Sequence, residues 1–190
     1  GFFMAPHLAG PERPPLAGTQ VMLDIDDVLF PWADEVHRRC GDAGLHDGSA
    51  PWKTWHMWED YGCSKEAWLD VVTSATLDGM YVDTAPFPGS VEAARRLYWA
   101  GATIHVVTAR GFMNAGSEIR EWTKAWLAEH AFPWHTLSFA KNKVDSQADI
   151  FHHEGLRRGG FPESFLPRFD YAIDDGVHNF EALDLSLIHI

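Results

Sequence analysis

The stretch "VMLDIDDVLF", residues 21–30, decides the fold, because an apolar run is interrupted there by the carboxylates of Asp24, Asp26 and Asp27. Residues 21–25 have the composition of a buried strand. Burying ions without partners is costly, so acidic side chains at the end of such a strand need compensation. Ligands of open α/β sheets bind outside the carboxyl ends of the strands. The stretch therefore predicts a strand that leads into a functional site.

Three further segments have the length and apolar character of central parallel strands, namely "ATIHVV" at 102–107, "TLSF" at 136–139 and "DYAI" at 170–173. Apolar residues recur at helical spacing in three other segments. These predict helices over 91–100, with Ser90 as the cap, over 117–130 and over 143–156. Strands that alternate with helices predict an α/β fold with a parallel sheet flanked by helices.

The segment 31–85 differs, since it lacks a strand pattern and is rich in aromatic residues. We expect a small, mostly helical cap there, inserted after the first strand of a core that comprises 18–30 and 86–184. Residues 1–17 are rich in proline and are predicted to be a flexible arm. The tail at 185–190, "LSLIHI", is either a further strand or a non-native ending, and the sequence leaves both open.

Composition limits the possible functions. The chain has 190 residues with 46% hydrophobic content, which suits one domain with a small insertion. A net charge of −12 argues against general binding to nucleic acid or to an anionic membrane. No apolar stretch approaches the roughly 18 to 20 residues of a membrane span. Two cysteines outside any CxxC pattern suit a reducing compartment, so we expect a cytoplasmic protein.

Polar side chains follow every predicted strand, and the topology should bring them to one edge of the sheet. Crowded carboxylates repel one another, and a hard cation such as Mg²⁺ removes that penalty with oxygen ligands. A hydroxyl and an ammonium group would suit the oxygens of a phosphate. The residues predicted to form this metal and phosphate site are Asp24, Asp26, Thr108, Lys143, Asp174 and Asp175.

The ordered motifs DxDxV (Asp24, Asp26, Val28), strand-Thr (Thr108), Lys143 and DD (Asp174, Asp175) resemble those of the haloacid dehalogenase superfamily. The resemblance covers about residues 20–184. It implies a Rossmann-like core with an inserted cap. The details "DIDDVLFPW", "PFPGSVEAARRL", "IHVVTAR" and "IDDGVHNFEAL" are similar to the 5′(3′)-deoxyribonucleotidase-like branch, including bacterial and phage members.

This resemblance implies a role for each site residue. Asp24 would attack phosphorus and form an aspartyl-phosphate, and Asp26 would act as general acid and then general base. The Asp24 carboxylate, the Asp26 backbone carbonyl and Asp175 would hold Mg²⁺, with Asp174 supporting them. The charge of the transferring group would be stabilised by Thr108 and Lys143. Asn179 is a candidate for orienting one of the acids.

Several assignments stay open in the sequence. Lys141 competes with Lys143, which is favoured because it begins the following helix. Arg110 could equally contact phosphate or form a surface ion pair, and Asp27, at a position often taken by glycine, is expected to be structural. The predicted substrate-binding residues are Phe30, Trp55, Thr108, Ala109, Arg110 and Lys143. A cap tryptophan is more often a core residue than a base-stacking one.

Three hypotheses for function follow. The leading one is a Mg²⁺-dependent phosphomonoesterase that acts on a nucleoside monophosphate, since a cap would exclude long polymers. The second is a polynucleotide-end 3′-phosphatase of the same superfamily, against which the acidic charge and the cap speak. The third is a non-catalytic fragment that binds a metal or a nucleotide. The complete set of acids favours an enzyme.

Overall fold

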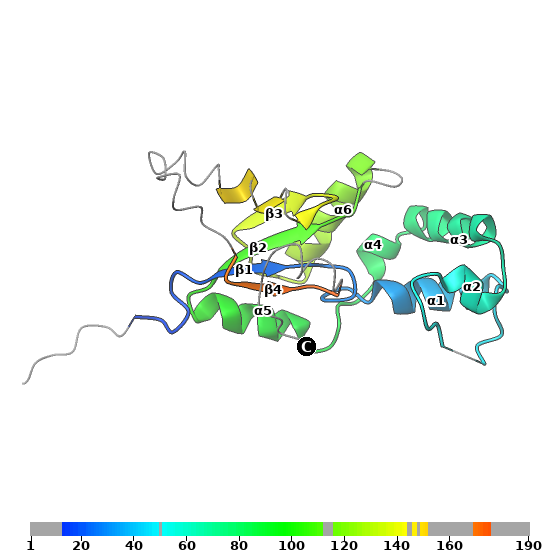
Figure 1. The fold of residues 1–190 in the computed structure, drawn as a ribbon, viewed down its shortest axis with the longest axis horizontal. Helices are drawn as coiled ribbons and strands as arrows, with labels where there is room; N and C mark the ends of the chain where they lie inside the picture. The colour runs from blue at the N-terminus through cyan, green and yellow to red at the C-terminus, as the bar shows by residue number, and fades with distance from the viewer. Residues whose placement is uncertain are drawn as a thin grey trace, which may run out of the picture.

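The computed structural model describes residues 13–49, 51–111, 116–143, 146–147, 149–151 and 169–175. It has an α/β fold with a four-stranded parallel sheet in the order β3-β2-β1-β4, flanked by helices (Figure 1). The predicted fold class is confirmed. The strands are β1 (Gln20–Leu23), β2 (Thr103–Thr108), β3 (Thr136–Phe139) and β4 (Tyr171–Ile173), each within two residues of its predicted bounds.

The first strand lies in the middle of the sheet. Leu23 of β1 pairs with Val106 of β2 on one side and with Ile173 of β4 on the other. Val21, Met22 and Leu23 are each at most 3% exposed, as expected for a strand that is covered on both faces. All pairings are parallel, so the carboxyl ends of the four strands lie at the same edge.

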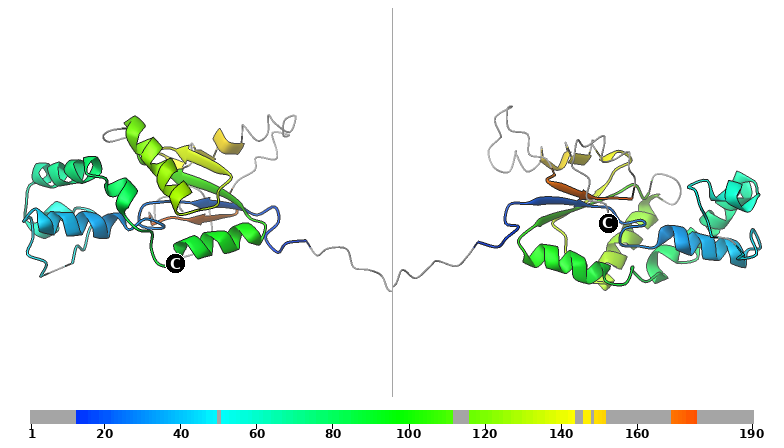
Figure 2. Two further views of the ribbon diagram at one scale, coloured as in Figure 1. Left: turned by 180° about the vertical axis from the view of Figure 1, so that it is seen from behind. Right: turned by 60° about the horizontal axis from the view of Figure 1, so that its bottom comes forward.

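The two faces of the sheet have separate hydrophobic clusters. Leu23, Ile104 and Val106 pack toward α5 (Ser90–Trp99) and α6 (Gly116–Glu129), which both cover one face (Figure 2). Met22 and Val107 pack on the other face with Phe169, Ala172 and two residues of the segment at 149–151. Residues 143, 146–147 and 149–151 are helical, which agrees with a helix that begins at Lys143, and the rest of its predicted range lies outside the described residues.

The start of α5 differs from the prediction that Ser90 caps it. Gly89 is the N-cap residue and adopts a left-handed conformation with φ of 82°. Ser90 is the first helical residue, and its hydroxyl donates to the carbonyl oxygen of Phe87 at 2.8 Å. The short turn before the helix contains prolines and a glycine. It requires a positive φ at Gly89, which glycine adopts without strain. The glycine therefore occupies the position that the serine was expected to fill.

Four helices lie between β1 and α5, namely α1 (Trp32–Asp42), α2 (Met57–Tyr61), α3 (Lys65–Leu77) and α4 (Met80–Asp83). They extend beyond the edge of the sheet at which β1 ends (Figure 1). Trp68 is 6% exposed and contacts Trp32 and Trp58, so these tryptophans help to build a core for the small helical segment.

Residues 13–17 of the predicted arm form a turn against the end of α5, where the amide of Leu16 donates to the carbonyl of Ala100 at 2.8 Å. The remaining part of the arm, the candidate residue Asn179 and the tail at 185–190 lie outside the described residues. Within the described ranges, no helix is long and apolar enough to cross a membrane.

Trp126 of α6 joins the core beneath the site, because it is fully buried and contacts Phe30 and Phe132. Its indole Nε1 also donates to the carbonyl of Thr84 at 2.7 Å. We expect Trp126→Ala to lower the free energy of unfolding by about 3–5 kcal/mol, measured by urea denaturation. Trp99→Ala, at a side chain that is 72% exposed, is the matched control and should change stability little. Equal losses in both variants would contradict the packing described here.

Candidate active site

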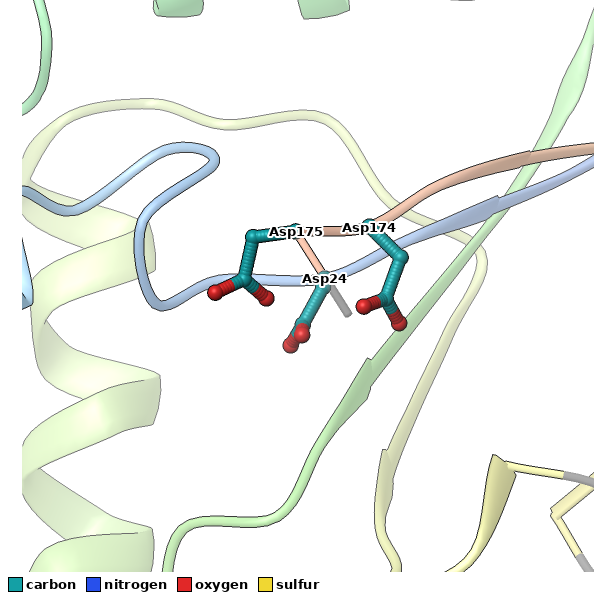
Figure 3. Close-up of side chains that lie close together, drawn as sticks. All are labelled: Asp24, Asp174 and Asp175. Atoms are coloured by element: carbon teal, nitrogen blue, oxygen red, sulfur yellow. The ribbon is translucent and has the colours of Figure 1, made fainter. Parts of the chain in front are cut away.

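Three carboxylates converge at the carboxyl edge of the sheet. Asp24 directly follows β1, and Asp174 and Asp175 directly follow the neighbouring β4. Their side chains lie on the same side of the two strand ends (Figure 3). One carboxylate oxygen from each lies within 4.8 Å of the others. This arrangement arises from the parallel pairing of β1 and β4, in which the amide of Asp24 donates to the carbonyl of Ile173 at 3.0 Å.

Lys143 is the cation that faces these acids. Its Nζ lies 3.0 Å from Oδ1 of Asp24 and 3.7 Å from Oδ2 of Asp174. The ammonium also donates to the backbone carbonyl of Val107 at 2.8 Å, and the residue is only 5% exposed. Lys141, the competing candidate, is exposed. The structure thus brings Lys143 to the predicted site, and its buried ammonium partly balances the carboxylates.

The carboxylates are nevertheless under-compensated. Burial, opposed by Lys143 and reinforced by Asp174 and Asp26, raises the pKa of Asp24 to about 7. Burial and the charge of Asp174 likewise raise the pKa of Asp175 to about 6. Such shifts mean that burial, together with the repulsion between the acids, disfavours their ionised forms in the protein alone. A hard divalent cation with oxygen ligands would remove this penalty, so the donor set fits the predicted metal.

Asp26 lies outside the three-acid cluster and pairs with Arg110 instead. Nε of Arg110 contacts both carboxylate oxygens, at 3.0 and 3.1 Å, and Nη2 contacts Oδ1 at 2.6 Å. The Arg110 side chain is 1% exposed, whereas that of Asp26 is 29% exposed. The ion pair left open by the sequence is therefore present, but it is buried and not on the surface.

Asp27 has a structural role that its place in the motif suggested. It adopts a left-handed conformation with φ of 56°, which glycine would adopt more easily. Its Oδ1 accepts a hydrogen bond from the amide of Ala33 at 2.8 Å, in the first turn of α1. Burial, offset in part by this hydrogen bond, raises the pKa of Asp27 to about 7. Asp27 thus links the loop that follows β1 to the start of α1.

Thr108 and Ala109 end β2 at the same edge, and the Thr108 hydroxyl accepts a hydrogen bond from the amide of Arg110 at 3.3 Å. Thr108 is fully buried and Ala109 is exposed. Phe30 was predicted to line the substrate, but it is fully buried against Tyr81 and Trp126. Contact between Phe30 and a ligand would therefore require a neighbouring side chain to move.

Trp55 lies in the segment that leads into α2, and α2 lies at the end of the molecule away from the sheet (Figure 1). It is 54% exposed and contacts Trp52, with ring centroids 6.3 Å apart. The structure does not bring it to the three carboxylates. Sequence analysis overlooked Tyr81 and Thr123, which surround Arg110, because nothing in their local pattern marks them as neighbours of the motif.

No protein-family model and no curated protein matches this sequence. Among solved structures, the chain is similar to a hydrolase from Streptococcus pneumoniae TIGR4, with a TM-score of 0.52 and 12% identity over 87% of this chain and 89% of that one. It is also similar to the haloacid dehalogenase-like hydrolase SP0104 from Streptococcus pneumoniae, with a TM-score of 0.49, 14% identity and coverage of 87% and 80%.

A third similar structure is a putative beta-phosphoglucomutase from Thermotoga maritima, with a TM-score of 0.44 and 16% identity over 88% of this chain and 82% of that one. At these identities, the likeness to the TIGR4 hydrolase concerns the fold alone. It extends over most of both chains.

The raised pKa of Asp175 predicts that its ionised carboxylate lowers the stability of the metal-free protein, although the same carboxylate is needed to bind the metal. Its folded pKa of about 6 exceeds the unfolded value of 3.8, so ionisation destabilises the fold increasingly as pH rises through this interval and fully above it. In EDTA at pH 8, Asp175→Asn should raise Tm by a few degrees, with a smaller gain at pH 5.

The same variant should lose the rise in Tm that Mg²⁺ gives the wild type, because a ligand is missing. Asp70→Asn, at an exposed position on α3, is the control and should keep the Mg²⁺ response. Calorimetry at both pH values measures these changes. If the variant is less stable than the wild type in EDTA at pH 8, the ionised carboxylate of Asp175 does not destabilise the fold, and the prediction is wrong.

Proposed function

We propose that this protein is a Mg²⁺-dependent phosphomonoesterase of the haloacid dehalogenase type. The observation that carries the proposal is the placement of Asp24 beside the buried ammonium of Lys143, 3.0 Å away, with the carboxylates of Asp174 and Asp175 next to it. A nucleophile, a cation for phosphate and an oxygen-rich metal site suit phosphoryl transfer in this combination.

In the proposed reaction, a carboxylate oxygen of Asp24 forms a bond to phosphorus while the bond from phosphorus to the leaving oxygen breaks. Asp26 gives its proton to that leaving oxygen, which departs as an alcohol. Asp26 then takes a proton from water, whose oxygen attacks phosphorus and breaks the bond to Asp24. Inorganic phosphate leaves, and both aspartates regain their starting states.

The other residues bind and orient. Asp24, the Asp26 backbone carbonyl and Asp175 would hold Mg²⁺, with Asp174 behind them, and the ion when bound supplies positive charge to the phosphate oxygens. Lys143 and Thr108 would stabilise the remaining charge of the transferring group. The contact of Lys143 with the Val107 carbonyl fixes the ammonium at the strand ends, so this cation is preorganised.

We further propose a small phosphorylated substrate, with a nucleoside monophosphate as the first candidate. The helices α1–α4 lie beyond the edge of the sheet that carries the acids, where they could enclose a small molecule (Figure 1). The acidic net charge of −12 opposes a polynucleotide substrate, whose phosphates would be repelled along their length. The resemblance of the motifs to the deoxyribonucleotidase-like branch supports the nucleotide.

The first test is phosphate release from a panel of phosphomonoesters. The panel comprises ribo- and deoxyribonucleoside 5′- and 3′-monophosphates, a 3′-phosphorylated oligonucleotide, a sugar phosphate and p-nitrophenyl phosphate. We expect release that depends on Mg²⁺, is abolished by EDTA and is fastest on mononucleotides. Asp24→Asn should reduce release to background, because an amide cannot serve as the nucleophile.

Faster release from the oligonucleotide would favour the polynucleotide-end phosphatase. A folded wild-type protein whose Tm rises with Mg²⁺ but that releases no phosphate would support the non-catalytic binding module. Retention of activity by Asp24→Asn would refute the aspartyl-phosphate mechanism.

A pair of lysine variants tests which ammonium stabilises the phosphoryl group. Lys143→Met should lower kcat by about 10²–10³-fold, as loss of a preorganised charge-stabilising group does. Lys141→Met, two residues away and exposed, should stay within about threefold of wild type under the same assay. Steady-state kinetics on the best substrate compares them. A larger loss in Lys141→Met than in Lys143→Met would reverse the assignment.

A further inference from the structure

Arg110 is held in a closed environment whose parts come from three different segments, namely the loop between β1 and α1, α4 and α6. Its guanidinium lies 4.5 Å from the ring centroid of Phe30 and 4.4 Å from that of Tyr81 on α4. Its Nη1 donates to the hydroxyl of Thr123 on α6 at 3.2 Å. Because only 1% of its side chain is exposed, Arg110 has little room to adopt another orientation.

The pair that Arg110 forms with Asp26 is directional. Two nitrogen atoms of the fork contact the carboxylate, with three nitrogen–oxygen distances between 2.6 and 3.1 Å. Such bidentate contacts fix the plane and the position of a carboxylate as well as its distance. The side chain of Asp26 is partly exposed, whereas that of Arg110 is buried. The buried guanidinium of Arg110 therefore fixes the orientation of the Asp26 carboxylate.

The neighbours of Arg110 in turn are held in place. The hydroxyl of Tyr81 accepts a hydrogen bond from Nε1 of Trp32 at 3.0 Å, and Phe30 packs on Trp126. The Thr123 hydroxyl donates to the carbonyl of Ile119 at 2.7 Å, which leaves it oriented to accept from the guanidinium. Residues of α1, α4 and α6 therefore determine together where the fork of Arg110 lies.

We propose that Arg110 is a positioning residue, which holds the Asp26 carboxylate in the orientation needed for proton transfer to the leaving oxygen and contacts no phosphate itself. This inference rests on the proposed function. It assigns Arg110 to Asp26 and not to the substrate, although the residue follows the phosphate-binding candidate Thr108 by two positions. Its guanidinium faces aromatic rings, a hydroxyl and the carboxylate, all of which the fold supplies.

A positioning role makes the effect of Arg110 depend on the leaving group. A nucleoside leaving oxygen needs a proton as its bond to phosphorus breaks, whereas p-nitrophenolate is stable enough to leave without one. Loss of a general acid commonly costs about 10²–10⁴-fold where the proton is needed. We expect Asp26→Asn to show such a loss in the first-turnover release of the leaving group from a nucleoside monophosphate and a much smaller one from p-nitrophenyl phosphate.

The test compares Arg110→Met with wild type on these two substrates in the presence of Mg²⁺. We expect the rate of leaving-group release in the first turnover to fall about 10–100-fold on the nucleoside monophosphate and to stay within about threefold on p-nitrophenyl phosphate, because the later hydrolysis of the aspartyl-phosphate is common to both substrates. The inhibition constant of inorganic phosphate should also stay within about threefold. In the Asp26→Asn background, Arg110→Met should cause no further loss, because the residue acts through Asp26. Arg96→Met, at an exposed position on α5, is the control.

Two further variants apply if the methionine variant does not fold. Arg110→Lys keeps the positive charge but loses the fork, and Thr123→Val removes one hydrogen bond that orients it. Both should show the same selective loss on the nucleoside monophosphate, smaller in Thr123→Val. Full activity of Arg110→Lys on both substrates would overturn the inference.

Equal losses on both substrates, together with weaker inhibition by phosphate, would overturn the inference and assign Arg110 to phosphate binding. Additive losses with Asp26→Asn, or a gain of activity in Arg110→Met, would overturn it as well. If the wild type releases no phosphate from either substrate, the proposed function fails and the inference falls with it. Failure of the inference alone is recognised by an active wild type whose Arg110 variants lack the predicted dependence on the leaving group.

Discussion

The structure depends on one costly feature, the burial of Asp24 at the carboxyl end of the central strand. Its charge lies next to Asp174 and Asp175, and burial disfavours the ionised state of the cluster. The ammonium of Lys143 and the backbone amide of Ile25, which donates to Oδ1 of Asp24 at 2.7 Å, offset this cost in part. A protein that gained nothing from this arrangement would be more stable with apolar side chains there.

The rest of the sheet is consistent with that constraint. Parallel pairing of β1 with both β2 and β4 places Asp24, Thr108 and Asp174 at a single edge. Two hydrophobic clusters, one on each face, hold the sheet rigid beneath them. Rigidity matters because carboxylates that could drift apart would relieve their repulsion and lose the geometry that a cation requires.

The charge of Asp26 is balanced in a different way. Asp26 is compensated by a buried arginine rather than by the metal site, and the arginine is surrounded by aromatic rings from α4 and from the loop before α1. Because these rings belong to the helical segment and to the core, the orientation of Asp26 depends on both parts of the molecule. Asp27 ties the same loop to α1 through the Ala33 amide. The acids of one short motif therefore have separate structural environments.

The sequence by itself determined the strands, the alternation with helices and the acids at the strand ends, because short apolar runs and helical spacing are local properties. It also favoured Lys143 over Lys141, because Lys143 begins the following helix as the pattern of the resembled family has it. The tertiary structure alone decided that Arg110 binds Asp26, that Phe30 is buried and that α2, which follows Trp55, lies away from the sheet. These facts depend on contacts between residues far apart in the chain, such as Arg110 with Thr123 on α6 and Tyr81 on α4, and no local pattern encodes such contacts.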